Sequence, residues 1–287
     1  MAKLLLLLLT VISFSFSGRA SHVMGGDITW TCSGGVYVFQ LVFYRDCEGP
    51  EINTLSETIE VWNHPSITTI VANYVSREDL SPICTQVAGG PSPLTCGTGA
   101  GGGSGVGAIE KITYISDPID LPGTPPAEGW IFTYDNFSRS ANITNIPNPS
   151  NFGLTITSKM FAIPNAPVGC VDNSPQFLQD PYFVSCVGDP YAYNMNAVDA
   201  DLDSLSISFG APLNDFSGTY NPPTNPTLLP YEPSFSASSP TPGPTLNPLN
   251  IPAQIDPSSG NLTFQSFNTG NFVVKVVAQS FREGVLI

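Results

Sequence analysis

Residues 194–209 read Asn-Met-Asn-Ala-Val-Asp-Ala-Asp-Leu-Asp-Ser-Leu-Ser-Ile-Ser-Phe and join an acidic turn to a strand. The aspartates Asp199, Asp201 and Asp203 occupy alternate positions at the start of this join. From residue 204 onward, serine alternates with leucine, isoleucine and phenylalanine, which is the period of a half-buried β-strand. The stretch therefore predicts a β fold in which an acidic turn leads into a strand.

The three carboxylates of this turn are close enough in sequence to repel one another. Water reduces such repulsion in a solvated turn, where aspartate is common. A hard cation such as Ca²⁺, which takes several oxygen ligands, does so in a metal site. The turn is not an EF-hand, because Ser204 and Gly210 stand where that loop requires Gly and Glu, counting from Asp199. The solvated turn and the metal site both remain open.

A second acidic segment lies upstream, where residues 172–175 read Asp-Asn-Ser-Pro. Together with the alternating aspartates, it resembles the linker and turn of cadherin-like repeats, which bind calcium at the joint between two β-sandwiches. Leu202 stands where bacterial versions of the turn have glycine, so we expect no left-handed backbone there. The resemblance implies a Ca²⁺ site with the ligands Asp172, Asn173, Asp199 and Asp201, and with Asp203 as a further candidate.

Residues 1–20 have the features of a secretory signal peptide. Lys3 supplies the positive end, residues 4–16 form a short apolar run, and the small residues Gly18 and Ala20 suit cleavage before Ser21. A membrane anchor needs roughly 20 apolar residues, and no stretch of the chain is that long and apolar. We therefore expect a soluble, exported protein without a membrane span.

The composition favours a β protein and excludes several kinds of partner. Removal of the signal peptide leaves about 267 residues, enough for two domains of ordinary size. The formal net charge is −14 and becomes about −16 without Lys3 and Arg19, so nucleic acid and anionic membranes are not expected partners. The 28 prolines and 26 glycines suit turns between short strands, and no segment keeps a helical period.

The sequence thus predicts an all-β chain of two consecutive β-sandwich (Ig/cadherin-like) domains. A Pro/Asn-rich link at residues 164–170 divides residues 1–20 (signal peptide) and 21–168 (N-terminal domain) from residues 169–287 (cadherin-like domain). We expect a helical turn at residues 77–80. The expected strands are 26–31, 36–45, 54–62, 66–71, 108–115, 130–135, 151–161, 182–186, 191–197, 204–209, 231–236, 261–267 and 271–280. Residues 285–287 begin another strand, so we expect the second domain to be truncated at its last strand.

Six cysteines in an exported chain predict disulfides and no free thiol. Sequence alone leaves their pairing open. The pairs considered are Cys84 with Cys96, Cys170 with Cys186 and, by elimination, Cys32 with Cys47. A simple hairpin over residues 27–44 would disfavour the Cys32–Cys47 pair.

No residue pattern predicts catalysis, so we expect that the chain is not an enzyme. His22 and His64 are the only histidines, and Ser104 lacks a nucleophile-elbow context. Gly97, Gly99 and Gly102 match Gly-x-Gly-x-x-Gly, but neither a strand precedes them nor a helix follows. An extracellular hydrolase with facing carboxylates is the remaining enzymatic alternative.

Three further segments, residues 26–32, 43–47 and 281–287, resemble the N-terminal region of large secreted Bacteroidota surface proteins. Many of these proteins end in a gliding-motility-associated C-terminal sorting domain. The resemblance implies export across the outer membrane and an extracellular or cell-surface location. The expected partners are an unknown surface glycan or protein and further domains of a longer chain.

The function expected from these observations is a non-catalytic structural or adhesive module, stiffened by calcium at its joint. The alternative is a carbohydrate-binding module of a secreted enzyme. An exposed row that included Trp30, Trp62 or Trp130 would favour sugar stacking, whereas burial of all three would favour a scaffold.

Overall fold

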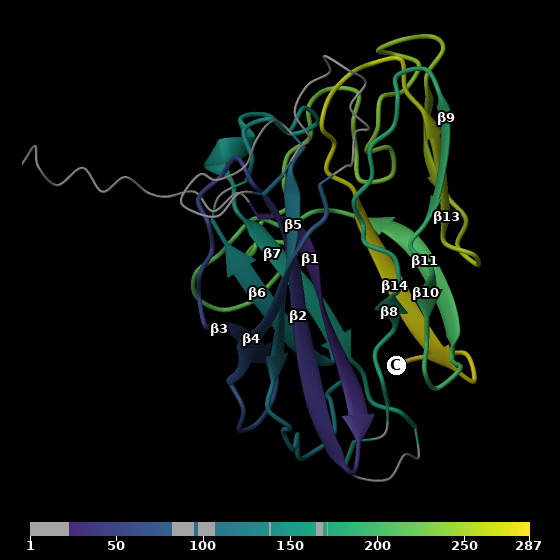
Figure 1. Ribbon diagram of the computed structural model, residues 1–287. Coiled ribbons are helices and arrows are strands. Elements are labelled where there is room, and N and C mark those ends of the chain that lie inside the picture. The colour runs from purple at the N-terminus through teal and green to yellow at the C-terminus, as the bar shows by residue number, and fades with distance from the viewer. Residues whose placement is uncertain (1–22, 82–94, 97–106, 138, 165–168, 171) are drawn as a thin grey trace, which may run out of the picture.

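The computed structural model describes residues 23–81, 95–96, 107–137, 139–164, 169–170 and 172–287. Every regular element in these ranges is a strand, apart from one 3₁₀ turn, Pro149–Asn151 (Figure 1). The all-β prediction is therefore confirmed. No helix in the described ranges is long and apolar enough to cross a membrane. The predicted signal peptide, Cys84, Ser104 and the glycine motif lie outside the described residues.

The first half of the chain forms one antiparallel sheet with the strand order β1-β2-β5-β4-β3-β6-β7. The two end strands, β1 and β7, also contact each other, so the sheet curls around a common interior. At this seam Gly26 is required, because an added Cβ would clash with the backbone oxygen of Val42 and would also lie 2.6 Å from Ile156 Cδ1. The strands are β1 (Val23–Ser33), β2 (Val36–Asp46), β3 (Ser56–Trp62), β4 (Thr69–Asp79), β5 (Ile109–Ser116), β6 (Trp130–Asn136) and β7 (Leu154–Met160).

Aromatic rings from several strands meet inside this sheet. Phe39 lies 4.7 Å from Phe132, and Phe43 stacks on Tyr134 at 5.6 Å, measured between ring centroids. The opposite face of β2 is also buried, because Val42 and Tyr44 belong to a second cluster against which Tyr182 packs. This explains why both faces of β2 are apolar in the sequence, as in a strand covered on two sides.

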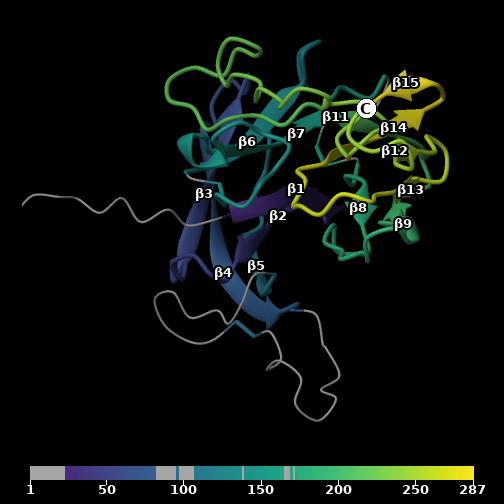
Figure 2. The same cartoon turned by 90° about the horizontal axis from the view of Figure 1, so that it is seen from above.

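The second half forms three small sheets beside the first (Figures 1 and 2). Residues 285–286 pair with the end of β14, although residues 285–287 were expected to be too short to pair. The sheets are β10-β8, β12-β13-β9 and β11-β14-β15. Their strands are β8 (Gln176–Phe177), β9 (Pro190–Asn194), β10 (Ala197–Val198), β11 (Ser204–Gly210), β12 (Ile251–Ile255), β13 (Asn261–Gln265), β14 (Lys275–Arg282) and β15 (Val285–Leu286).

Three local predictions are wrong. Residues 77–80 form no helical turn, because β4 continues to Asp79 and pairs with β5 through Glu78 and Lys111. Residues 182–186 and 231–236 form no strand; Tyr182 packs on the first sheet, and Glu232 donates its N–H to the Asn145 carbonyl. Residues 211–250 are irregular, as their composition indicates, and Leu213 forms a bridge with Thr155 at the edge of β7. In residues 182–186 and 231–236, contacts with the first half of the chain thus replace local strand pairing.

All three expected cysteine pairs are wrong. The disulfides are Cys32–Cys170 and Cys47–Cys96, and Cys186 is exposed and free, contrary to the expectation of no free thiol. Cys32 sits at the end of β1, where the segment after Cys170 is hydrogen-bonded to that strand. These pairings join residues far apart in the sequence, so loop length could not predict them.

Candidate functional site

The predicted acidic site lies where the β10–β11 turn meets the segment before β8. Carboxylate oxygens of Asp172, Asp201 and Asp203 all lie within 4.8 Å of one another. Asp172 and Asp203 are largely buried, with side chains 8% and 6% exposed. The structure therefore brings together three of the five residues named from the sequence as facing carboxylates.

Arg282, at the end of β14, occupies the centre of this acidic cluster. Its Nη2 lies 2.7 Å from Asp172 Oδ1, and its Nε donates to Asp203 Oδ1 at 2.8 Å. Nη2 also contacts Asp203 Oδ2 and lies 3.8 Å from Asp201 Oδ2. The sequence reasoning missed Arg282. Its position depends on the β11–β14 register, in which Ser204 pairs with Phe281, and local sequence pattern does not report that register.

Asp199 and Asn173 have other partners, although both border the cluster. Asp199 Oδ1 accepts the N–H groups of Asp201 and Asp203 at 2.8 and 3.3 Å, while its Oδ2 accepts the Ser280 hydroxyl at 2.6 Å. Asn173 Oδ1 accepts the Cys32 N–H at 2.8 Å, and its Nδ2 points to Asp201 at 3.0 Å. Asp199 thus organises the turn, and Asn173 presents a donor, rather than an oxygen, to the carboxylates.

The expectation of an ordinary backbone at Leu202 is wrong. Its φ is 65°, in the left-handed region, and its side chain is 91% exposed. The two N–H groups held by Asp199 Oδ1 flank this residue and close the turn around it. Side-chain hydrogen bonds therefore impose the conformation that glycine would otherwise provide.

The electrostatics of the cluster are unequal among its members. The pKa of Asp172 is raised to about 7, chiefly by burial and also by the neighbouring aspartates, against the opposing effect of Arg282. The hydrogen bonds that Arg282 donates to the Asp203 carboxylate raise the pKa of the Arg282 guanidinium. We conclude that Arg282 binds chiefly to Asp203, and that burial favours the protonated form of Asp172.

A Ca²⁺ ion takes six to eight oxygen ligands, and its chemistry suits this cluster only in part. Asp172, Asp201 and Asp203 would be the protein ligands, with water filling the other positions. The oxygens of Asp199 and Asn173 are engaged by N–H and O–H donors. One guanidinium faces four aspartates, so further positive charge would still reduce their mutual repulsion.

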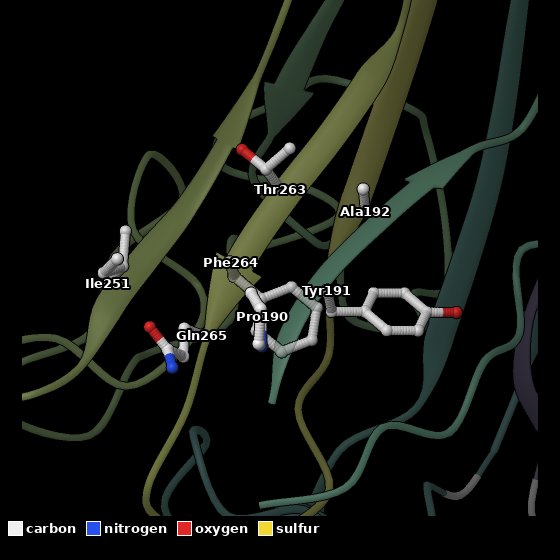
Figure 3. Close-up of a pocket in the computed structure, with 7 residues that line it drawn as sticks. All are labelled: Pro190, Tyr191, Ala192, Ile251, Thr263, Phe264 and Gln265. Carbon is white, nitrogen blue, oxygen red and sulfur yellow. The ribbon is translucent and has the colours of Figure 1, made fainter. Parts of the chain in front are cut away.

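Other candidate sites from the sequence are structural. His64 Nδ1 accepts the N–H groups of Ser66 and Ile67, its ring lies 4.5 Å from the Trp130 ring, and burial lowers its pKa. A shallow depression of about 280 Å³ between β9, β12 and β13 has no carboxylate, histidine or lysine in its lining (Figure 3). Neither place offers a general base beside a nucleophile.

The three tryptophans divide into two kinds. Trp30 and Trp130 lie in the core at 3% and 2% exposure. Trp62 is half-buried on the outer face of β3, where Phe216 and Tyr220 pack against it with ring centroids 5.8 and 6.3 Å away. No tryptophan forms part of a fully exposed row, and the 211–250 segment supplies the cover over Trp62.

No family model, curated protein or solved structure matches the chain in comparisons with known proteins.

Proposed function

We propose that the chain is a non-catalytic structural or adhesive module of an exported cell-surface protein. Two disulfides support an oxidising, extracellular compartment. The resemblance to secreted Bacteroidota surface proteins favours the same location. The adhesive ligand would be a surface glycan or protein.

The observation that carries this proposal is the joint between the two halves. The Cys32–Cys170 disulfide crosses it covalently. Next to this disulfide, Trp30 and Ser174 exchange hydrogen bonds, the Ser174 N–H donating to the Trp30 carbonyl at 3.1 Å. A joint held by covalent and polar contacts suits a module that must transmit force without changing shape.

Force applied at the two ends of the chain tests this role. In the oxidised protein, the load should pass from β1 through Cys32 to Cys170 and bypass the strands between them. The disulfide spans 138 residues, so reduction should add roughly 480 Å of releasable chain at about 3.5 Å per residue. Equal extension of the oxidised and reduced proteins in single-molecule pulling would show that the joint bears no load.

The second candidate, a carbohydrate-binding module, rests on Trp62 and Tyr220, whose rings stack at an interplanar angle of 29°. A sugar ring would have to stack on the parts of Trp62 and Tyr220 that their mutual packing leaves exposed, since both side chains are half-buried. Glu60 lies on the same face of β3, two residues before Trp62. Calorimetric titration with a panel of soluble oligosaccharides distinguishes the two functions. Binding that Trp62→Ala abolishes and Trp62→Phe retains would support this candidate over a purely structural role.

A further inference from the structure

Lys111 and Asp180 form an ion pair that joins the two halves of the chain. Lys111 lies in β5, and Asp180 follows β8 in the second half. The Lys111 Nζ is 2.7 Å from Asp180 Oδ1, across a sequence separation of 69. The carboxyl carbon is bonded to that oxygen, so it lies within about 4 Å of the amine nitrogen. An amine, which is nucleophilic when neutral, is therefore held beside an electrophilic carbon.

Two tyrosines hold Asp180 in this position. Tyr44, a buried cross-strand partner of Lys111, donates its hydroxyl to Asp180 Oδ1 at 2.8 Å. Tyr193 donates its hydroxyl to the Asp180 backbone carbonyl. Direct cross-strand partners point to the same face of a sheet, so the Tyr44 hydroxyl and the Lys111 amine reach the carboxylate from one face. Both the side chain and the backbone of Asp180 are thereby fixed against that face.

A third ionisable group, Asp27, lies on the same face of the sheet. It pairs with Val42, two residues before Tyr44 on β2, and alternate residues of a strand share a face. Its Oδ1 is buried and has no hydrogen-bond partner among the described residues. Burial raises the pKa of Asp27 to about 6, and the Lys111 charge opposes this. Asp27 can therefore exchange a proton near neutral pH, beside an amine that must lose one to become nucleophilic.

An apolar cluster borders the ion pair and limits its contact with water. Its buried members, Val42, Tyr44 and Ile109, come from the two strands that flank this position. The side chains of Lys111 and Asp180 are 27% and 33% exposed, so water reaches only part of the pair. Partial removal of water favours the neutral amine and the carboxylic acid over the two ions. It also favours a condensation, because water is the product that leaves.

We propose that Lys111 and Asp180 join spontaneously through an isopeptide bond, which links the two halves of the chain covalently. The ammonium first loses one proton to Asp27, and the neutral nitrogen attacks Asp180 Cγ. The N–C bond forms and the bond from Cγ to Oδ2 breaks, while Tyr44 stabilises the negative charge that develops on Oδ1. Oδ2 leaves as water with two of the three ammonium protons, and the third proton stays on the amide. No oxidant, reductant or other co-reactant is consumed.

This bond goes beyond the proposed structural role and does not depend on it. It would join the same two halves as the Cys32–Cys170 disulfide, but reducing agents do not break an amide. In the pulling experiment, a chain linked between residues 111 and 180 releases less length on reduction. Lys111→Arg is therefore the chain to which the full increase in length applies.

Intact-mass spectrometry of the full chain, reduced and denatured after folding, tests the bond. The wild type should weigh one water molecule less than its sequence requires. Lys111→Arg keeps the ion pair, but its guanidinium stays protonated and does not attack, so this variant should have its full mass. Asp180→Asn should lose one ammonia instead of one water, because the same attack then expels the amide nitrogen. Peptide mapping of the wild type should recover one branched peptide that joins residues 111 and 180.

The position of the water loss decides between this bond and ring closure at an aspartate. Asp180 cannot close onto the next backbone nitrogen, because Pro181 has no N–H. A water loss that persists in Lys111→Arg and yields no branched peptide would come from another aspartate and would overturn the proposal. Full mass of the folded wild type after prolonged incubation, with circular dichroism showing the β fold, would also overturn it.

Discussion

At the scale of single residues, Asp27 shows how a buried charge can weaken the contact between the two halves. It lies on the outer face of β1, and its Oδ1 is buried with no hydrogen-bond partner in the described structure. The nearby Lys111 ammonium is bound to Asp180 Oδ1 at 2.7 Å, and Tyr44 donates to the same oxygen. Burial raises the pKa of Asp27 to about 6, and Lys111 opposes this only in part.

Asp27→Asn should therefore stabilise the protein at neutral pH. The folded pKa of about 6 exceeds the unfolded value of 3.8, so the native chain binds more protons between these values. Stability should rise as the pH falls through 6, and the ionised carboxylate should cost up to about 3 kcal/mol at pH 7. Chemical denaturation at pH 7.5 and pH 5 measures both effects. The exposed Asp120→Asn is the control, and an equal pH response of Asp27→Asn and the wild type would contradict the prediction.

Leu202 gives a second prediction at this scale. A left-handed backbone costs a non-glycine residue about 1–2 kcal/mol, and replacement by glycine removes this cost. Glycine also has more conformational freedom in the unfolded chain, and the loss of that freedom on folding cancels part of the gain. Leu202→Gly should stabilise by up to about 1 kcal/mol, whereas the β-branched Leu202→Val should destabilise. The free energies of unfolding in urea decide this. Equal free energies of unfolding for Leu202→Val and Leu202→Gly would contradict a left-handed backbone at this position.

At the scale of elements, the end of β14 and the β10–β11 turn are coupled by charge. Arg282 reaches from one to the other and contacts Asp203, while Asp172 approaches from the linker before β8. Register places these groups together, because β11 and β14 pair over their whole length. Arg282 thus provides part of the positive charge that the sequence alone led us to expect from a Ca²⁺ ion.

Removal of that arginine separates its role from that of calcium. Arg282→Met should destabilise by about 2 kcal/mol, below the usual value for a buried ion pair because the arginine side chain is 30% exposed. Millimolar Ca²⁺, compared with chelator, should raise the melting temperature of the wild type and should raise that of Arg282→Met more. Asp201→Asn should weaken this response more than Asp203→Asn. The same melting temperature with calcium and with chelator, in both the wild type and Arg282→Met, would rule out the metal.

At the scale of the whole molecule, the Cys32–Cys170 disulfide has the largest expected effect. It closes a loop across a sequence separation of 138 and thereby ties β1 to the second half of the chain. Cys47–Cys96 lies within that loop and closes a separation of 49. The longer loop should restrict the unfolded chain more, because loop-closure entropy grows with length.

Replacement of Cys32 and Cys170 together by alanine should destabilise by up to about 5 kcal/mol in the chain-entropy account. Cys186→Ser is the matched control and should leave the melting temperature unchanged, because Cys186 is exposed and free. Peptide mapping of the unreduced protein checks the pairing itself. Recovery of a Cys170–Cys186 peptide would contradict the topology described above.

The local sequence predicts the β class and most strand positions, because alternation between two faces is a property of a few neighbouring residues. The segment after Asp203 and the doubly apolar β2 are examples of such local patterns. It also singled out Asp172, Asp201 and Asp203. Three features depend on the folded chain: which cysteines pair, the position of Arg282 among these aspartates, and the Asn173 amide donor that faces Asp201. These features depend on groups up to 138 positions apart, and short-range pattern carries no information about such distances.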